Sequence, residues 1–217
     1  MKLRSIFFLA LLALACSGRL AHADYVFQFT DASGAAKNSF SLNTGDTVDI
    51  RVYLLQTGSS TGLSAQGLNS AGVQLNTASP SVANDTATVA NSAFDSTSTT
   101  VGANAKVTEG QISSSAVKAP TSGADANRIL VGTFTFTGLN AGSTLTVTAI
   151  PSTGSSVNVI APGGADSGSI DGVIVGSSAV ITVFPEPGSL VLCGLAAAGM
   201  VAGALRRRRR ATTTPAV

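Results

Sequence analysis

Apolar and polar residues alternate along several short stretches in the middle of the 217-residue chain. In the clearest stretch, Thr47–Gln56, every second position is apolar, and these positions hold Val48, Ile50, Val52 and Leu54. Asp49 and Arg51 lie between them. Because successive side chains of a β-strand point to opposite faces of its sheet, this stretch is expected to be a strand with one buried and one wet face.

Other stretches share this character and are bounded by Gly, Asn, Asp or Ser, as strands usually are. With the first, they cover 25–29, 47–56, 72–75, 128–137, 143–150 and 176–184, and weaker candidates lie at 86–89 and 111–117. No stretch between positions 24 and 184 has the period of about 3.6 residues that an amphipathic helix shows. The pattern predicts an all-β domain of short strands.

The stretch 128–137 changes its pattern partway along. Consecutive apolar residues at its start give way to alternation at Phe134 and Phe136. This change indicates a β-bulge or a strand that is buried on both faces. The turn that follows ends in Gly142, which can adopt a positive φ, and alternation resumes at 143–150. These two stretches are predicted to pair as a hairpin.

Many short strands with turns between them favour an antiparallel β-sandwich, and a jelly roll is the alternative. The domain is expected to cover residues 24–184, enough to bury a core without disulfides. Two stretches, 57–70 and 78–115, contain mainly Ser, Thr, Ala, Gly and Asn. Such stretches bury little apolar surface, so surface loops are favoured over polar strands or O-glycosylated segments.

Residues 1–23 have the parts of a secretory signal peptide: a basic start, an apolar run and small residues before a cleavage point. Ala21 and Ala23 occupy the small positions, so signal peptidase is expected to cleave after Ala23. The apolar run is shorter than the roughly 20 residues of a membrane span, which disfavours an uncleaved anchor. Cys16 as a lipoprotein acceptor is an alternative, although Leu14 is larger than the residue expected there.

The other end of the chain combines a proline motif, an apolar run and a basic cluster. Pro185, Glu186 and Pro187 come first, and the apolar run begins at Leu190 and ends at Leu205. Five consecutive arginines follow, namely Arg206, Arg207, Arg208, Arg209 and Arg210. As a helix the run is about 24 Å long, slightly short of a bilayer core of roughly 30 Å.

This order predicts a single C-terminal transmembrane helix of marginal length. Each Arg at the bilayer centre costs about 3 kcal/mol on translocon scales, so the cluster is expected to stop translocation. The arginines and residues 211–217, a short tail, then stay in the cytoplasm and the sandwich lies outside. The prolines favour an extended, exposed hinge before the helix, or alternatively Pro187 only starts the helix.

The order of the three parts in residues 185–210 resembles the PEP-CTERM sorting signal of Gram-negative, biofilm-forming bacteria. Pro185, Glu186 and Pro187 match that signal position for position, whereas residues 211–217 extend beyond it. The resemblance implies an exosortase-type membrane transpeptidase as a partner and removal of the tail. It also implies delivery of the mature protein to the cell surface or extracellular matrix.

Parts of the domain resemble cohesin-like and carbohydrate-binding-module-like sandwiches. The run Gly45-Asp46-Thr47-Val48 is similar to the start of an early strand in those modules, and residues 129–136 are similar to a late core strand. The resemblance implies a module that binds carbohydrate or protein, as the alternative to a structural or adhesive role.

Composition limits the chemistry of the domain. Between positions 24 and 184, five basic residues against ten acidic ones give a net charge of −5, so nucleic-acid binding is not expected. The single histidine, His22, and the two cysteines, Cys16 and Cys193, lie outside the domain, which excludes imidazole and thiol catalysis there. The carboxylates show no spacing typical of a paired-carboxylate hydrolase, and Glu109 is interpreted as a lone surface charge.

Two further features are candidate ligand sites. Asp166 and Asp171 share a Gly-containing loop and form a weak candidate site for calcium, although a plain turn also explains them. Tyr53 is expected on the wet face of its strand, where it can stack on an extracellular polysaccharide, but the absence of tryptophan disfavours this. The sequence thus predicts an exported structural or adhesive protein without a cofactor, and an enzyme is the least favoured function.

Overall fold

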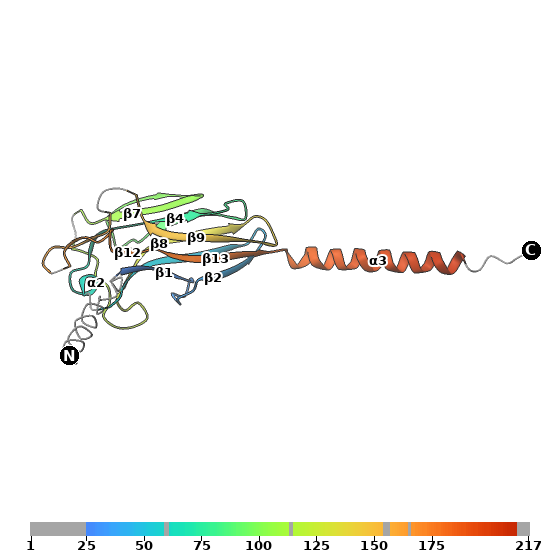
Figure 1. Ribbon diagram of the computed structural model, residues 1–217, viewed down its shortest axis with the longest axis horizontal. Helices are drawn as coiled ribbons and strands as arrows, with labels where there is room; N and C mark the ends of the chain where they lie inside the picture. Colours follow the sequence, from blue (N-terminus) through green and yellow to red (C-terminus); the bar gives the residue numbers. More distant parts are fainter. Residues whose placement is uncertain (1–24, 59–60, 113–114, 154–156, 165, 212–217) are drawn as a thin grey trace, which may run out of the picture.

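The computed structural model describes residues 25–58, 61–112, 115–153, 157–164 and 166–211. Within them, two β-sheets pack face to face and one long helix extends away from the end of the pair (Figure 1). This arrangement confirms the predicted all-β, two-sheet domain. The predicted signal peptide, with Ala21 and Ala23, lies outside the described residues.

The first sheet has five strands. Their order is β12 (Ile174–Val175), β1 (Tyr25–Thr30), β3 (Thr47–Gln56), β8 (Arg128–Gly138) and β5 (Ala83–Ala90). The pair β12–β1 is parallel, and the other neighbours are antiparallel. The strand predicted at 47–56 therefore lies at the centre of this sheet, where both of its edges are paired.

The second sheet has eight strands. Its main path is β11 (Gly168–Ser169), β10 (Val159–Ile160), β4 (Leu68–Thr77), β9 (Ser143–Pro151), β13 (Ser177–Phe184) and β2 (Ser39–Asn43). A hairpin of β6 (Ser96–Thr100) and β7 (Asn104–Gly110) extends it, because β7 pairs with β4. The pair β13–β2 is parallel, and β13–β9 is antiparallel.

The core lies between the sheets and follows the predicted alternation. On β3, Ile50, Val52 and Leu54 are fully buried, whereas Asp49 is exposed, which confirms the predicted faces of this strand. Fully burying a side chain of this kind stabilises the fold by roughly 1.5–3 kcal/mol. Strand β3 therefore supplies much of the apolar contact between the two sheets.

The bulge expected in 128–137 is present. Val52 of β3 pairs with Gly132, but the next residue, Tyr53, pairs with Leu130, so Val131 is the extra residue on β8. The Val131 side chain is fully buried. A bulge increases local twist and re-aims the side chains beside it.

The predicted hairpin between 128–137 and 143–150 is wrong. Strand β8 lies in the first sheet, where it pairs with β3 and β5, whereas β9 lies in the second sheet, where it pairs with β4 and β13. The turn between them crosses from one sheet to the other. Gly142 does have a positive φ of 76°, and its N–H donates to the Val183 carbonyl of the second sheet.

The loops favoured for 57–70 and 78–115 are also wrong in large part. These stretches contain the short helix α2 (Gly62–Ala65), the start of β4, and the strands β5, β6 and β7. Where a strand was expected at 111–117, the described residues contain only an isolated bridge, between Val117 and Leu68, and β7 ends before this stretch, at Gly110. Strand β7 buries small residues, Ala105 and Val107, on its inner face, so its alternation lacks the large apolar residues that identify most strands.

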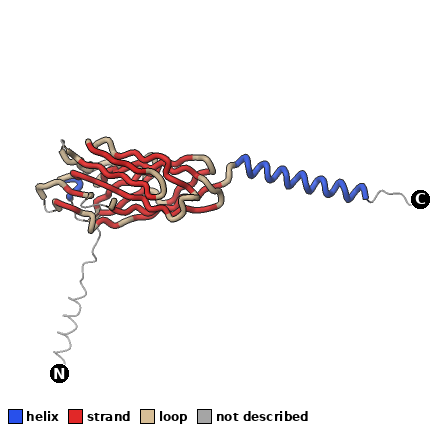
Figure 2. Tube along the Cα trace, turned by 90° about the horizontal axis from the view of Figure 1, so that it is seen from above, coloured by secondary structure: helices blue, strands red, loops and turns tan. Residues whose placement is uncertain are grey.

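The C-terminal helix α3 spans Pro187–Ala211 and points away from the sandwich (Figure 2). Its described side chains between Val191 and Ala202 are exposed. No helix among the described residues is long and apolar enough to cross a membrane. The side chains of Arg206 to Arg210 lie outside the described part of this helix.

Candidate functional site

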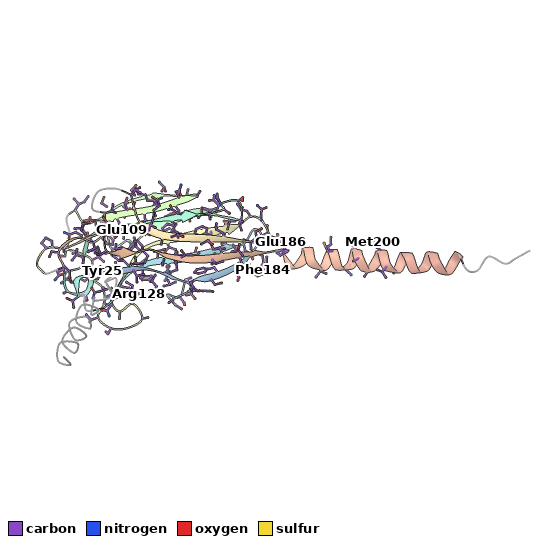
Figure 3. The ribbon with its side chains drawn as sticks, viewed as in Figure 1. Tyr25, Glu109, Arg128, Phe184, Glu186 and Met200 are labelled. Carbon is purple, nitrogen blue, oxygen red and sulfur yellow. The ribbon has the colours of Figure 1, made fainter. Side chains whose placement is uncertain are left out.

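The proline motif lies at the junction between the sandwich and α3. Strand β13 ends at Phe184, and Pro185 and Glu186 form the link to the helix (Figure 3). The Phe184 carbonyl accepts a hydrogen bond from the Thr44 N–H, so the link is held at the base of the β2–β3 turn. Glu186 is exposed and Pro185 is partly exposed. The backbone of this link is therefore accessible from solution.

Pro187 is the first residue of α3. Proline suits that position because its fixed φ matches the helix and its missing N–H is not needed there. Pro185 and Glu186 therefore form the link before the helix. For Pro187 the alternative interpretation holds, because this residue starts the helix.

Tyr53 is buried, which contradicts the prediction that it lies on a wet face. Only 5% of its surface is exposed, and the Arg128 guanidinium lies 4.3 Å from the centroid of its ring. The Arg128 side chain and the segment before β8 explain the difference, because they cover the ring at this place, where Pro120 and Asp125 line a cleft of about 240 Å³ together with Tyr53. Tyr53 cannot serve as a stacking platform for a sugar.

Arg128 connects this region to two loops. Its Nε and Nη2 donate to Asp125 Oδ1, Nη1 donates to Gln28 Oε1, and Nη2 also donates to the Gly34 carbonyl. The side chain is 6% exposed. A buried guanidinium with partners on all three nitrogens is satisfied within the chain. Arg128 therefore holds the loop after β1 and the segment before β8 against the first sheet.

The two aspartates proposed for calcium do not act alike. Asp171 accepts hydrogen bonds from the Val157 and Asn158 N–H groups, from the Asn158 side-chain amide and from the Ser169 hydroxyl. Asp166 accepts one from the Thr61 N–H at 3.4 Å. In the described part of the chain, no three acidic, His or Cys residues cluster as metal ligands. The geometry supports the plain-turn interpretation for Asp171, and calcium binding stays a prediction.

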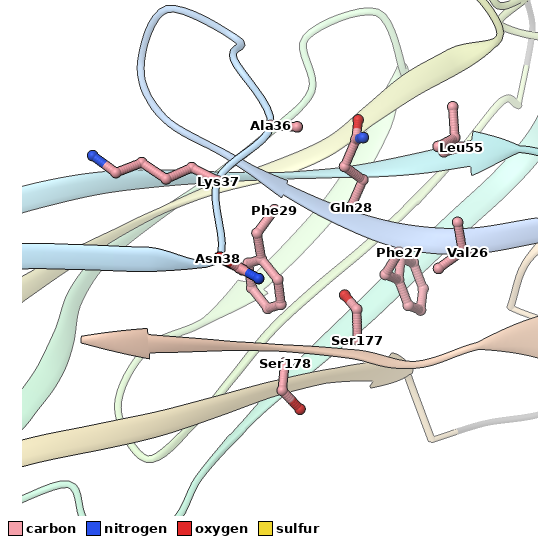
Figure 4. Close-up of a pocket in the computed structure, with 10 residues that line it drawn as sticks. All are labelled: Val26, Phe27, Gln28, Phe29, Ala36, Lys37, Asn38, Leu55, Ser177 and Ser178. Atoms are coloured by element: carbon pink, nitrogen blue, oxygen red, sulfur yellow. The ribbon is translucent and has the colours of Figure 1, made fainter.

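A cleft of about 420 Å³ lies where β1 and β13 separate (Figure 4). We call this side of the sandwich the β1–β13 seam. Phe27, Phe29, Lys37, Asn38 and Ser177 are among the residues that line it. The volume is in the range of small-ligand sites. No local sequence pattern indicates this cleft, because its walls come from opposite ends of the domain.

Both ends of the cleft are closed by the chain itself. At one end β12 pairs with Tyr25 and Val26 of β1. At the other end the Lys37 N–H donates to the Phe29 carbonyl, and the Asn38 carbonyl accepts from the Val180 N–H of β13. The cleft is therefore a bounded hollow between the two sheets rather than a groove that runs through the domain.

The opposite side of the sandwich contains two buried acids, and we call it the β5–β7 seam because β5 lies beside the β6–β7 hairpin there. Glu109 is only 5% exposed, so its interpretation as a surface charge is wrong. Burial raises the pKa of Glu109 to about 9, and the hydrogen bond from the Asn91 N–H opposes this rise. Burial likewise raises the pKa of Asp85 to about 6, opposed by the Thr88 hydroxyl.

Comparison with known proteins gives a likeness in structure but not in sequence. No protein family matches the chain, and no curated protein matches it. The similar solved structures include cohesin modules. One, from a family 33 glycoside hydrolase of Clostridium perfringens, is 6% identical, with 75% of this chain and 98% of that chain covered and a TM-score of 0.48.

Two further cohesins are similarly distant. A cohesin from Clostridium acetobutylicum is 13% identical, with 74% of this chain and 90% of that chain covered and a TM-score of 0.44. The sixth cohesin of scaffoldin B from Acetivibrio cellulolyticus, solved with a dockerin, is 11% identical, with coverages of 74% and 97% and a TM-score of 0.44. With TM-scores below 0.5, these likenesses carry no argument about function.

Proposed function

We propose that this chain is an exported cell-surface or extracellular-matrix protein, with a C-terminal tail for sorting and a β-sandwich that serves a structural or adhesive role. The position of the proline motif supports this most directly. Pro185 and Glu186 are the accessible link between the last strand of the sandwich and a helix that points away from it. A processing enzyme can reach this link without disturbing the fold.

The steps of the proposal follow from the parts of the chain. Signal peptidase removes residues 1–23 during export. The apolar run from Leu190 to Leu205 then enters the inner membrane, where the arginine cluster stops it. An exosortase-type transpeptidase acts at the Pro-Glu-Pro motif, and the sandwich is released from its tail to the surface or matrix of a Gram-negative bacterium.

We also infer that the sandwich is not an enzyme. Residues 24–184 contain no histidine or cysteine. The two carboxyl groups with strongly raised pKa values, Asp85 and Glu109, are buried at the β5–β7 seam, on the side of the sandwich away from the cleft. An acid that is to act on a substrate must lie within hydrogen-bond reach of it.

The sorting proposal is tested by co-expressing the chain with an exosortase-type transpeptidase and measuring the intact mass of the exported protein. The unchanged protein is expected to lose the arginine cluster. The Glu186→Ala protein is expected to keep the arginine cluster and to stay in the membrane fraction. Asp49→Asn, a change at an exposed carboxylate on β3, is the matched control and should be processed normally. Exported protein that still carries the five arginines would refute the proposal.

A binding role for the sandwich is the second candidate, and the cleft of the β1–β13 seam is the observation that favours it. Binding of extracellular polysaccharides or peptides is measured on arrays with the exported domain. Specific binding should be lost in Asn38→Arg, because the larger side chain fills the cleft mouth, and kept in Tyr53→Phe. Binding that survives Asn38→Arg would place the ligand elsewhere.

A further inference from the structure

The β6–β7 hairpin contacts the rest of the sandwich in two places, at β4 of its own sheet and at β5 of the other sheet. On one side β7 forms a regular ladder with β4 between Ser70 and Asn76. On the other side the hairpin meets β5, the edge strand of the first sheet, without a backbone ladder among the described residues. Side chains make the connections there, so their chemistry decides whether the seam stays closed.

Glu109 makes one of these connections. Its Oε2 accepts a hydrogen bond of 3.0 Å from the Asn91 N–H at the end of β5. Its Oε1 is buried and has no hydrogen-bond partner in the described part of the chain. The side chain lies on the inner face of β7 with Ala105 and Val107, in surroundings that solvate a neutral carboxyl group far better than a carboxylate.

Asp85 is placed in a comparable way farther along β5. Its Oδ2 accepts a 2.6 Å hydrogen bond from the Thr88 hydroxyl, which also lies 3.2 Å from the Thr100 carbonyl of β6. Its Oδ1 makes no close hydrogen bond, but the backbone N–H groups of Gly102 and Thr135 partly oppose the rise of its pKa, and the residue is 1% exposed. Asp85 and Thr88 thus connect β5 to the far end of the same hairpin.

No cation faces either carboxyl group from the described elements around them. Strands β4 and β6 contain no charged residue, and neither does the 101–103 turn. Lys106 on β7 donates to the Thr153 carbonyl, away from the seam. Arg128 on β8 is engaged by Asp125. A negative charge at Glu109 or Asp85 would therefore be buried without a neighbouring cation.

We propose that the β6–β7 hairpin is a flap that is latched to β5 by the protonated carboxyl groups of Asp85 and Glu109, and that loss of these protons releases it. Each carboxyl group uses one oxygen at the seam. The other oxygen of Glu109 has no hydrogen-bond partner among the described residues, and that of Asp85 has only weak backbone donors, at Gly102 and Thr135. Ionisation places a poorly solvated charge at the seam, which is relieved when the flap moves away and water enters. Release leaves β4 with one unpaired edge.

The direction of the raised pKa values agrees with this scheme. Both groups bind their protons more tightly when the seam is closed, so rising pH favours the open form. The effect begins near the ordinary carboxyl pKa of about 4. It is complete for Asp85 near its pKa of about 6 and for Glu109 near its pKa of about 9. Two steps of release are therefore expected.

The test is amide hydrogen exchange of the full-length protein, corrected for the intrinsic effect of pH, at about pH 5, pH 7 and pH 10. Amides of β7 should lose protection by at least about tenfold between the lowest and highest pH, whereas amides of β3 and β8 should keep theirs. Loss of protection that is equal in both sheets would show global destabilisation and overturn the proposal.

Variants assign the two steps. Glu109→Gln, which has nearly the same shape, should remove the loss of protection between about pH 6 and 9, and Asp85→Asn should reduce the loss between about pH 4 and 6, where both groups contribute. Asp49→Asn is the control and should leave the pH dependence unchanged over both ranges. At the lowest pH the open form carries the most protons as well, so all variants should match the unchanged protein most closely there. A Glu109→Gln protein that still opens at high pH would also overturn the proposal.

Discussion

The two sides of the sandwich are closed by different means. At the β1–β13 seam backbone hydrogen bonds join the chain to both sheets, because the Lys37 N–H donates to the Phe29 carbonyl of β1 and the Val180 N–H of β13 donates to the Asn38 carbonyl. The chain crosses between the sheets at both seams, from β12 to β13 at one and from β5 to β6 at the other. At the β5–β7 seam, however, the hydrogen bonds between the end of β5 and the hairpin involve side chains among the described residues. The comparison shows that a seam joined by backbone hydrogen bonds can leave a hollow between strands without opening the fold, whereas a seam held by side chains depends on their protonation.

The largest effect is expected from Phe27→Ala at the β1–β13 seam. Phe27 is 1% exposed, and truncating a buried Phe usually costs about 3–5 kcal/mol. Chemical denaturation should therefore show a much lower midpoint for this variant. Val89→Ala, at an exposed position of β5, is the control and should stay within about 0.5 kcal/mol. A small loss of stability for Phe27→Ala would mean that the neighbouring side chains move in to fill the space that Phe27 leaves.

Arg128→Met is expected to have the next largest effect, about 2–3 kcal/mol of lost stability, because it removes charged hydrogen bonds and the stack on Tyr53. The Gly34 carbonyl loses its donor, so the loop that closes one end of the cleft should become more sensitive to proteases. Limited proteolysis and thermal melting measure both effects. Arg51→Met serves as the comparison, and equal effects of the two changes would contradict this role.

Glu109→Gln should stabilise the protein at neutral pH, by on the order of 1–3 kcal/mol. Because burial raises the pKa of Glu109 to about 9, the unchanged protein loses stability as pH rises from the ordinary carboxyl pKa to that value. The Gln variant should show a flatter dependence over this window. Urea denaturation at several pH values measures this pH dependence of the free energy of unfolding. The same pH dependence in both proteins would contradict a raised pKa at Glu109.

The smallest effect is expected for Ser177→Ala beside the cleft. The Ser177 hydroxyl oxygen is buried without a hydrogen-bond partner in the described chain, so its removal should stabilise the protein by up to about 1 kcal/mol. Ser178→Ala is the matched control, because the Ser178 hydroxyl is 3.1 Å from that of Thr148 and its loss should not stabilise. The melting temperatures of the two variants measure this difference, and a melting temperature of Ser177→Ala no higher than that of Ser178→Ala would contradict the prediction.

Most of the longer strands with large alternating residues could be predicted, whereas the strands built from small residues could not. Strand β2 was missed although Phe40 and Leu42 alternate in it and are buried. Strand β3 matches its predicted bounds, and β1, β8, β9 and β13 match to within two residues. Strands β6 and β7 were missed because Ser, Thr and Ala alternate without a strong apolar signal. The false hairpin has a different cause: a short turn after β8 has the same local pattern whether the next strand stays in its sheet or crosses to the other.

The candidate sites depend even more on contacts between distant positions. Glu109 has a polar local sequence, and only its neighbours on β5, about twenty residues earlier, make it a buried acid. Tyr53 was misplaced because Arg128 and the segment before β8 cover its ring, and these contacts cannot be seen from 47–56. The proline motif could be found from sequence, because its meaning lies in the order of adjacent segments.

Strand β13 has a mechanical role that follows from its place in the sheet. It is the last strand of the sandwich, it lies between β9 and β2, and it continues through Pro185 and Glu186 into α3. Tension on the tail therefore loads both neighbouring ladders in shear, so that many hydrogen bonds must break together.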